Sequence, residues 1–505
     1  MSSVGQAVLL SWSAPPAASF ALAVTAIVYL RGWILMRRAR VPFVPPWRAV
    51  SFLLGLLALW AALASPLDTF SSFLITAHMV QHMLLMMVAP PLILLGAPLI
   101  PLVRGLPAFA AREFAGPFLN WRVALRVGNV LTNLWFALVL MGVVMFGWHT
   151  PRLYELALAS SSWHEFEHAC FFVASLIFWW PVVQPWPSRA HAPRWAIVPY
   201  LLIGDVQNTA LSAILIFSDR VLYPSYAAMP RLFGFSAQHD QAASGAIMWV
   251  MGSLAFLVPA VVIAVQCLST RTEQEHLRRT REPELVHGEQ LPASGGMAAS
   301  TQQSRKWFGE PKRQAFTFIV LFAAVGLTLA ALAAGSSDDD DQVLRSKSIA
   351  GDFLVSVFAP GGDLEAGANT FAVLVQNRSN NDVLRDATVD LQAGQRGGLR
   401  KTQIVRASTD PENKLLQSAD VDLPTAGAWS LYITVRDSAE SAEINLPLTV
   451  VKSETGFTLH WSYVVLVAFG AVLLIAYVWR HRAHNPVRML HSPSGAESAK
   501  AENLF

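Results

Sequence analysis

The sequence predicts an all-α polytopic membrane bundle of seven spans, followed by an extracytoplasmic all-β, immunoglobulin-like sandwich that two further spans flank. Three observations predict this class. Hydrophobic residues make up 53% of the 505 residues and charged residues only 14%, and the mean hydropathy is +0.41, unlike an ordinary soluble protein. Long apolar runs fill residues 1–268. Short runs of alternating polarity fill residues 342–455.

Seven apolar runs within residues 1–268 are each long enough to cross a hydrocarbon core of about 30 Å. They lie at 17–36, 49–65, 73–103, 129–148, 165–184, 195–217 and 242–267. The first run lacks the charged flank of a cleaved signal peptide, so we expect it to stay as a span. A polar linker at 269–314 leads to an eighth span at 315–334, and a ninth span at 461–479 precedes a polar tail at 480–505.

The positions of the arginines predict how the spans are oriented. Within residues 1–268, arginines gather in alternate connections, whereas the intervening connections hold only Arg152, Arg220 and Arg231. The arginine-rich connections include Arg37, Arg38 and Arg40 after the first span, Arg104 and Arg112 after the third, and Arg189 and Arg194 after the fifth. Because such connections stay in the cytoplasm, we expect the N-terminus and the sandwich outside, and the linker and the C-terminal tail in the cytoplasm.

The segment 342–455 predicts a β domain. Its alternating or β-branched runs are separated by Gly, Asn, Asp and Pro turns, and they lie at 352–359, 370–376, 387–391, 402–407, 415–420, 428–436 and 442–451. Seven short strands in a segment of this length are typical of an immunoglobulin-like sandwich. The segment contains no His, Met or Cys, so we expect no soft metal site within it.

Charge and cysteine content exclude several classes of function. The net charge of +3 is too small to indicate a nucleic-acid partner. The two cysteines, Cys170 and Cys267, both lie in apolar runs and form no Cys-x-x-Cys pair. The sequence therefore predicts neither a disulfide framework nor a thiolate metal site.

The stretch 76–87 carries the strongest chemical signal in the chain. His78 and His82 lie four residues apart and therefore share one face of a helix, which Met86 extends by a turn. With Met79 and Met83 they occupy a sector of roughly 140°, at 100° per residue. Imidazole and thioether groups together bind copper, above all Cu(I). We therefore predict that His78, Met79, His82, Met83 and Met86 are copper ligands.

Further histidines lie at the same predicted membrane face. His149 follows the fourth span, His164 and His168 begin the fifth with the same spacing of four, and His239 precedes the seventh. Because neutral imidazole is the commonest metal-binding side chain, we add His149, His164 and His168 to the predicted ligands. The polar neighbours expected to orient these imidazoles are Gln81, Glu167, His239, Asp240 and Gln241.

The same residues leave other chemistries open. Histidines and methionines in a bundle also serve as interhelical hydrogen-bonding and packing groups. The run 164–168 satisfies H-E-x-x-H, the zinc-protease signature in which the glutamate acts as base. A single haem between histidines of facing helices is a further alternative. Asp205, within the sixth predicted span, is either a proton or cation relay or a neutral hydrogen-bonded group.

Three blocks in order carry a resemblance to a known family. They are 78–83 with Ala89-Pro90-Pro91-Leu92 and Leu95-Gly96-Ala97-Pro98, then 148–154 with 164–168 and Phe178-Trp179-Trp180-Pro181, and finally Asp240-Gln241 with Gly245 and Met248-Trp249. Residues 15–268 thereby resemble the polytopic CtaG family of cytochrome c oxidase assembly factors. The segment 342–455, with Gly427-Ala428-Trp429-Ser430-Leu431, is similar to YtkA-like or FixH-like domains.

The resemblance implies a multi-pass protein of the bacterial inner (plasma) membrane, without enzymatic turnover of its own. Such a protein holds copper, expected here as Cu(I), at the outer face and helps deliver it to a haem-copper cytochrome c oxidase. The expected partners are an oxidase subunit and an extracytoplasmic copper donor, with the sandwich as the docking element. The fused sandwich departs from the plain family pattern, which leaves a copper transporter of the resistance type as the alternative and an intramembrane metalloprotease as a third hypothesis.

Overall fold

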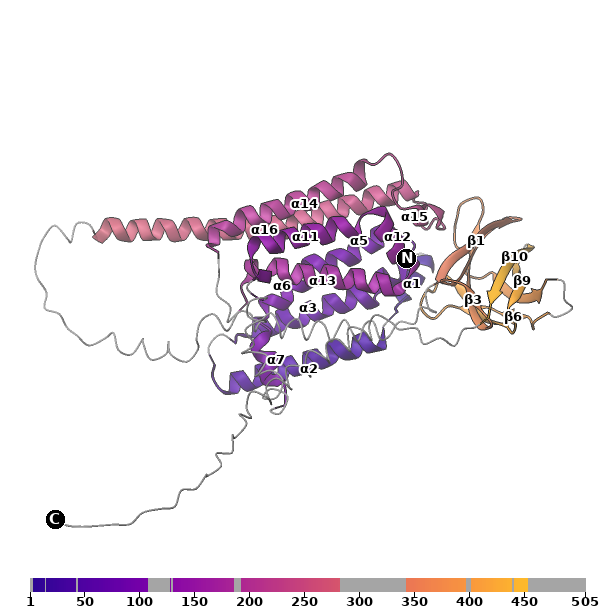
Figure 1. Cartoon of the computed structure of the whole chain (residues 1–505), viewed down its shortest axis with the longest axis horizontal. Helices are drawn as coiled ribbons and strands as arrows, with labels where there is room; N and C mark the ends of the chain where they lie inside the picture. Colours follow the sequence, from indigo (N-terminus) through magenta and orange to yellow (C-terminus); the bar gives the residue numbers. More distant parts are fainter. Residues whose placement is uncertain are drawn as a thin grey trace, which may run out of the picture.

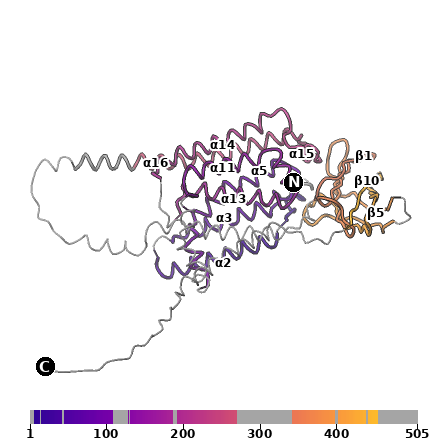
Figure 2. Tube along the Cα trace, viewed as in Figure 1, coloured from indigo at the N-terminus to yellow at the C-terminus, as the bar shows by residue number. Residues whose placement is uncertain are grey.

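The computed structural model describes residues 3–13, 15–41, 44–107, 128, 130–185, 192–281, 342–396, 401–437 and 440–452. The predicted spans at 315–334 and 461–479 and the predicted tail at 480–505 lie outside the described residues. A bundle of helices forms one part of the molecule, and a β domain lies at one end of the bundle, beside the N-terminus (Figure 1). The Cα trace in Figure 2 shows the same two parts along the chain.

Six helical segments in the described residues are long and apolar enough to cross a membrane, and the bent pair α11–α12 makes a seventh if it counts as one span. This confirms a polytopic bundle of six to seven candidate spans in the first half of the chain. The helices are α1 (Ser3–Leu10), α2 (Pro16–Arg38), α3 (Pro46–Ala64), α4 (Pro66–Ser71), α5 (Ile75–Met83), η1 (Leu84–Val88), α6 (Ala89–Leu95), α7 (Leu99–Gly105), α11 (Leu134–Trp148), α12 (Pro151–Ala159), α13 (Ser161–Val183), η3 (Arg194–Ala196), α14 (Ile197–Phe217), α15 (Pro224–Ala228) and α16 (Ala237–Arg281).

Local sequence explains where these helices begin and end. A proline opens α2, α3, α4, α12 and α15, because its fixed φ suits the first turn, where its missing N–H is not needed. Asn133 begins α11, because its Oδ1 accepts hydrogen bonds from the backbone N–H groups of Trp135 and Phe136. Helix α16 continues to Arg281, past residue 269, where the predicted linker begins. The Arg, Glu and Gln residues of that stretch are good helix formers, which accounts for the difference.

The run predicted as one span at 73–103 is broken into two segments. Helix α6 ends at Leu95, and Ala97 takes a positive φ of 46° just before Pro98, which cannot continue the α6 helix. Helix α7 then packs against α2 through two glycines. A Cβ on Gly32 would lie 1.8 Å from the carbonyl oxygen of Pro101, and a Cβ on Gly105 would lie 1.8 Å from that of Val28. Only glycine permits this close approach of two backbones.

A π-helical turn, η1, interrupts the histidine-bearing span directly after α5. Pro90 has no N–H to donate to the carbonyl oxygen of Met86, four residues earlier. The indole Nε1 of Trp179, on α13, donates to this oxygen instead, at 3.0 Å. A π turn also changes the angular spacing of the residues within it, so the position of Met86 relative to His78 and His82 is not that of a regular α-helix.

The β domain consists of two five-stranded sheets. One has the strand order β1-β2-β4-β8-β7 and the other β3-β10-β9-β5-β6. The strands are β1 (Gln342–Ala350), β2 (Phe353–Pro360), β3 (Leu364–Glu365), β4 (Gly367–Asn377), β5 (Thr388–Gln395), β6 (Val405–Arg406), β7 (Ser408–Thr409), β8 (Gln417–Leu423), β9 (Gly427–Arg436) and β10 (Ser441–Val451). The seven predicted strands correspond to β2, β4, β5, β6, β8, β9 and β10. Strand β1 was not predicted because it is a polar edge strand. Strands β3 and β7 were not predicted because they are very short.

The β domain packs against the end of the bundle through the outer face of its first sheet. Alternate residues of β2 and β4 point in opposite directions, so one set fills the interior of the β domain and the other faces the bundle. The second set packs in one apolar cluster with residues of the bundle: Phe358, Ala372, Leu374, Leu415 and Leu416 from the β domain, and Ala7, Phe70, Phe73 and Leu232 from the bundle. We call this cluster the docking interface.

Specific contacts also cross the docking interface. The rings of Phe73 and Phe358 lie 5.4 Å apart, centroid to centroid. The side chain of Gln376 donates to the carbonyl oxygen of Arg231 at 2.9 Å. The backbone N–H of Lys414 donates to the hydroxyl of Ser11 at 3.0 Å. The interface therefore fixes the β domain beside the segment that leads into α5.

We expect Phe358→Asp to separate the β domain from the bundle, because it places a carboxylate in a buried apolar contact. Hydrogen exchange should become faster at the amides of residues 73–78 and stay slow in β9, which reports on the folded β domain. Ile349→Asp is the matched control, because Ile349 lies on the same sheet and is 59% exposed. Unchanged exchange at residues 73–78 in Phe358→Asp would show that the docking interface contributes little.

Candidate metal centre

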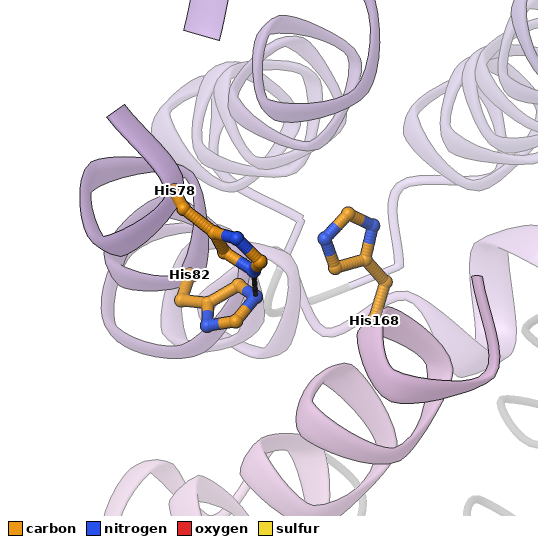
Figure 3. A group of neighbouring side chains, drawn as sticks. All are labelled: His78, His82 and His168. Atoms are coloured by element: carbon orange, nitrogen blue, oxygen red, sulfur yellow. Dashed lines mark hydrogen bonds between the residues drawn. The ribbon is translucent and has the colours of Figure 1, made fainter. Parts of the chain in front are cut away.

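Five histidines meet inside the bundle, at the end that carries the β domain. His78 and His82 come from α5, His164 and His168 from α13, and His149 follows α11. Within each pair the spacing of four residues places both rings on one helix face. His168 extends from its helix towards His78 and His82 (Figure 3). Tertiary packing of α5 and α13 thus brings together histidines that are far apart in the sequence.

The imidazoles are close enough to share an ion. The Nε2 atoms of His78 and His82 lie 2.8 Å apart. Ring centroids lie 5.4 Å apart for His82 and His168, 5.1 Å for His78 and His164, and 4.2 Å for His164 and His168. His78, His82 and His168 are buried, with 0%, 2% and 6% of their surface exposed. These rings are therefore shielded from water.

Glu167 adds a buried carboxylate to the imidazoles. Its Oε2 lies 3.8 Å from Nε2 of His78, and its Oε1 lies 4.0 Å from Nε2 of His82. Two groups of ligand atoms result, each with all its atoms within 4.8 Å of one another. One group is His78, His82 and His168, and the other is His78, His164 and Glu167.

The donor set fits a metal ion. Nitrogen ligands of a tetrahedral ion with bonds of about 2.0–2.1 Å lie about 3.3 Å apart, so small side-chain shifts bring either group to that geometry. Within the described residues, the Nε2 atoms of His164 and His168 and both oxygens of Glu167 have no hydrogen-bond partner. Buried polar atoms without partners are uncommon, and a bound ion satisfies them. The arrangement can therefore hold a cation that accepts nitrogen and oxygen ligands.

Tyr226, in α15, determines which nitrogen of His78 is available. Burial raises the pKa of the Tyr226 hydroxyl well above its ordinary value, so the group stays protonated at neutral pH. The hydroxyl donates its hydrogen to the carbonyl oxygen of Ser71, so it accepts from Nδ1–H of His78, at 3.0 Å. The Nε2 of His78 is then left with its lone pair directed at His82 and Glu167.

Two more tyrosines line the cluster. The rings of Tyr154 and Tyr223 stack at 3.9 Å, and the ring of Tyr154 lies 5.1 Å from that of His78. The hydroxyl of Tyr223 donates to the backbone oxygen of His149 at 3.1 Å. No sequence pattern predicted a role for these tyrosines or for Tyr226. The only local signal was the spacing of three between Tyr223 and Tyr226, which places both on one side of a helical turn.

His149 borders the cluster but belongs to neither group of close ligand atoms. Its Nδ1 donates to the carbonyl oxygen of Met145, one turn earlier, at 2.8 Å. Its ring centroid lies 6.4 Å from that of His82. Its Nε2 has no hydrogen-bond partner within the part of the chain that the structure describes. His149 is thus placed beside the cluster with one nitrogen free of hydrogen bonds.

Other predicted residues support the frame around the imidazoles. The carboxylate of Asp240 accepts hydrogen bonds from the backbone N–H groups of Ile75 and Thr76, at 2.8 and 3.1 Å, and so caps the first turn of α5. The side chain of Gln241 binds the backbone of Leu215, near the end of α14, and that of Arg220 and Leu222, in the connection that precedes Tyr223. Both residues position the elements that carry His78 and Tyr226.

Gln81 and His239 lie apart from the imidazoles. The side-chain amide of Gln81 donates to the carbonyl oxygen of Ala62 and to the carboxylate of Asp68. The side chain of His239 is exposed. Met79, Met83 and Met86 are buried in the core of the bundle, and their role as sulfur ligands stays a prediction.

We expect Asp240→Ala to destabilise the bundle by about 1–2 kcal/mol, because it leaves two N–H groups of α5 without their acceptor. A lower thermal midpoint in detergent, with faster hydrogen exchange at Ile75 and Thr76, is the expected result. Asp219→Ala changes an exposed carboxylate outside the α5 cap and should leave both measurements unchanged.

Tyr226→Phe should weaken metal binding by about 10–100-fold, because it removes the acceptor that orients His78. Competition with a chromophoric copper chelator measures this affinity in the purified full chain. Tyr200→Phe removes a buried hydroxyl that donates to the carbonyl oxygen of Phe178, away from the histidines, and serves as the control. Equal affinities of the two variants would contradict the role given to Tyr226.

The chain resembles proteins of three mycobacteria over about half of its length. It is similar to an uncharacterized protein of Mycobacterium leprae (strain TN), with 28% identity over 273 residues, which cover 51% of this chain and 39% of that protein. Uncharacterized proteins of Mycobacterium bovis and Mycobacterium tuberculosis are 26% identical to it over 268 residues, again 51% of this chain and 39% of theirs. The chain thus spans about two fifths of the length of these relatives. No solved structure matches the chain.

A family model covers the membrane bundle. It matches residues 27–270 and is described as cytochrome c oxidase caa3 assembly factor (Caa3_CtaG). The matched residues include the five clustered histidines, Glu167 and Tyr226, whereas the β domain lies outside the match. The part of this chain that builds the candidate metal centre therefore matches the cytochrome c oxidase caa3 assembly factor family.

Proposed function

We propose that this protein holds copper as cargo in its histidine cluster and helps deliver it to a haem-copper cytochrome c oxidase during assembly. The single observation that supports this best is the gathering of four histidines and a carboxylate in the segment that matches an oxidase assembly-factor family. Haem-copper oxidases need copper, and imidazole is a good copper ligand. The protein acts in this proposal as an accessory factor and not as an enzyme.

Cu(I) is the oxidation state that the proposal assigns to the cargo. Neutral imidazoles in a water-poor pocket suit a singly charged ion, because a cation of lower charge loses less hydration energy on burial. Buried methionines lie on the same span as His78 and His82 and supply softer ligands beside them. We keep Met79, Met83 and Met86 as proposed transfer positions and His149 as a proposed additional ligand.

The proposal places the cluster at the outer face of the bacterial plasma membrane. The arginine-rich connections are expected in the cytoplasm, which puts the N-terminus and the β domain outside. In the fold, the N-terminus, the β domain and the histidine cluster share one end of the bundle, which agrees with a common side for all three. Copper would then enter and leave from the exterior.

The β domain serves in this proposal as the docking element for an oxidase subunit or for an extracytoplasmic copper donor. We also propose that this domain is similar to YtkA-like or FixH-like domains and has the architecture of an immunoglobulin-type sandwich. The sequence of 342–455 contains no His, Met or Cys, so its contribution is to bind a partner protein and not the metal.

The double variant His78→Ala/His82→Ala tests the proposal directly. Purified protein should lose bound copper, and cells that carry the variant should lose oxidase activity while total cellular copper stays unchanged. His239→Ala removes an exposed histidine from the same end of the bundle and is the matched control. Copper retained by the double variant would refute the assignment of the site.

Two other functions give different results in the same experiments. A copper transporter would change total cellular copper when the gene is removed, whereas an assembly factor would not. A zinc protease of the H-E-x-x-H type would carry zinc, lose it on His164→Ala, and require Glu165 for peptide cleavage. The structure adds His78 and Glu167 to His164 in one ligand group, which a protease motif alone does not explain.

A further inference from the structure

We propose that the cluster is a single-ion site with two positions, and that His78 is the ligand shared by both. This inference rests on the proposed function and specifies how the cargo would move. The inner position is formed by His78, His82 and His168, and the outer position by His78, His164 and Glu167. One ion occupies one position or the other.

The shared use of His78 excludes two ions at once. Its Nδ1–H donates to the hydroxyl of Tyr226, which itself donates to the carbonyl oxygen of Ser71. His78 therefore offers only Nε2 to a metal. Both ligand groups include His78, and one nitrogen lone pair binds one ion. The four histidines of the two ligand groups consequently provide alternatives for one ion and not two complete sites.

The two positions differ in depth within the bundle. His82 lies one helical turn after His78 on α5, and His168 lies one turn after His164 on α13. Both helices begin at the end where the β domain docks, so the later residues lie deeper, by about 6 Å at 1.5 Å per residue. An ion that stays bound to His78 while it exchanges His164 and Glu167 for His82 and His168 moves inward along this direction.

Glu167 is a ligand of the outer position and also lies beside the inner position. Its carboxylate oxygens lie 3.8 Å from Nε2 of His78 and 4.0 Å from Nε2 of His82. When the cation displaces the proton of this carboxyl group, the resulting carboxylate stays close during the exchange and lowers the cost of moving the cation through a medium of low dielectric constant. The side chain is fully buried, so water does not screen this attraction.

The ligand types also differ between the positions. The inner position offers three imidazoles, and the outer position offers two imidazoles and a carboxylate. A carboxylate is a harder ligand than imidazole, so the outer position accepts a wider range of cations and the inner one favours copper. The structure thus assigns reception of the ion to the outer position and its selective retention to the inner one.

Titration of the purified full chain with Cu²⁺ alone tests this inference, because electron paramagnetic resonance reports the number of nitrogen ligands. The wild-type chain should bind one ion. His82→Ala/His168→Ala should retain one ion with two nitrogen ligands, and His164→Ala/Glu167→Gln should retain one ion with three. His78→Ala should bind more weakly than either double variant.

Two outcomes would overturn the inference and leave the proposed function intact. The first is that the wild-type chain binds two ions. The second is that both double variants lose all copper binding although they unfold at the same temperature as the wild-type chain. A wild-type chain that binds neither Cu²⁺ nor, in a second titration under reducing conditions, Cu(I) overturns the proposed function as well. The number of ions bound to the wild-type chain is measured without any variant. This measurement therefore tests the inference even if a variant does not fold.

Discussion

The hydrogen-bond chain from His78 through Tyr226 to Ser71 is the interaction on which the candidate centre depends. It satisfies one nitrogen of His78 and leaves the other directed into the cluster. Imidazoles and a carboxylate in an apolar bundle cost free energy unless each polar atom finds a partner. The Nδ1 atoms of His78 and His149 each have a hydrogen-bond acceptor in the protein. A bound cation would provide a partner for Nε2 of His164 and His168 and for the oxygens of Glu167.

The bundle holds this arrangement through groups that never touch the cluster. Asp240 caps the start of α5, and Trp179 binds the carbonyl oxygen that Pro90 leaves without its usual donor. The first contact fixes the beginning of the histidine-bearing segment, and the second ties its π turn to α13, the helix that carries His164 and His168. Both pairs of histidines are therefore held in one frame, which suits a site that must keep its shape while a ligand is exchanged.

The docking interface connects the β domain to the same frame. Gln376 of β4 binds the carbonyl oxygen of Arg231, and the guanidinium of Arg231 binds the carbonyl oxygens of Tyr226 and Ala227. Phe73, which lies just before α5, packs against Phe358 of β2. The β domain thus contacts both elements that position His78. A partner protein that binds the β domain would act on these elements through packed side chains and a short series of hydrogen bonds.

The sequence by itself determined the features that depend on local periodicity. Apolar runs predicted the candidate spans, and the alternation of polar and apolar residues predicted most strands of the β domain. The spacing of four residues predicted that His78 shares a helix face with His82, and His164 with His168. Only the tertiary structure decided which spans are neighbours, that Tyr226 meets His78 across 148 residues, and that the β domain packs over this end. The physical reason is that hydropathy reports how deep a residue lies in a membrane, whereas lateral neighbours are chosen by the shapes of packed side chains, such as Gly32 against Pro101.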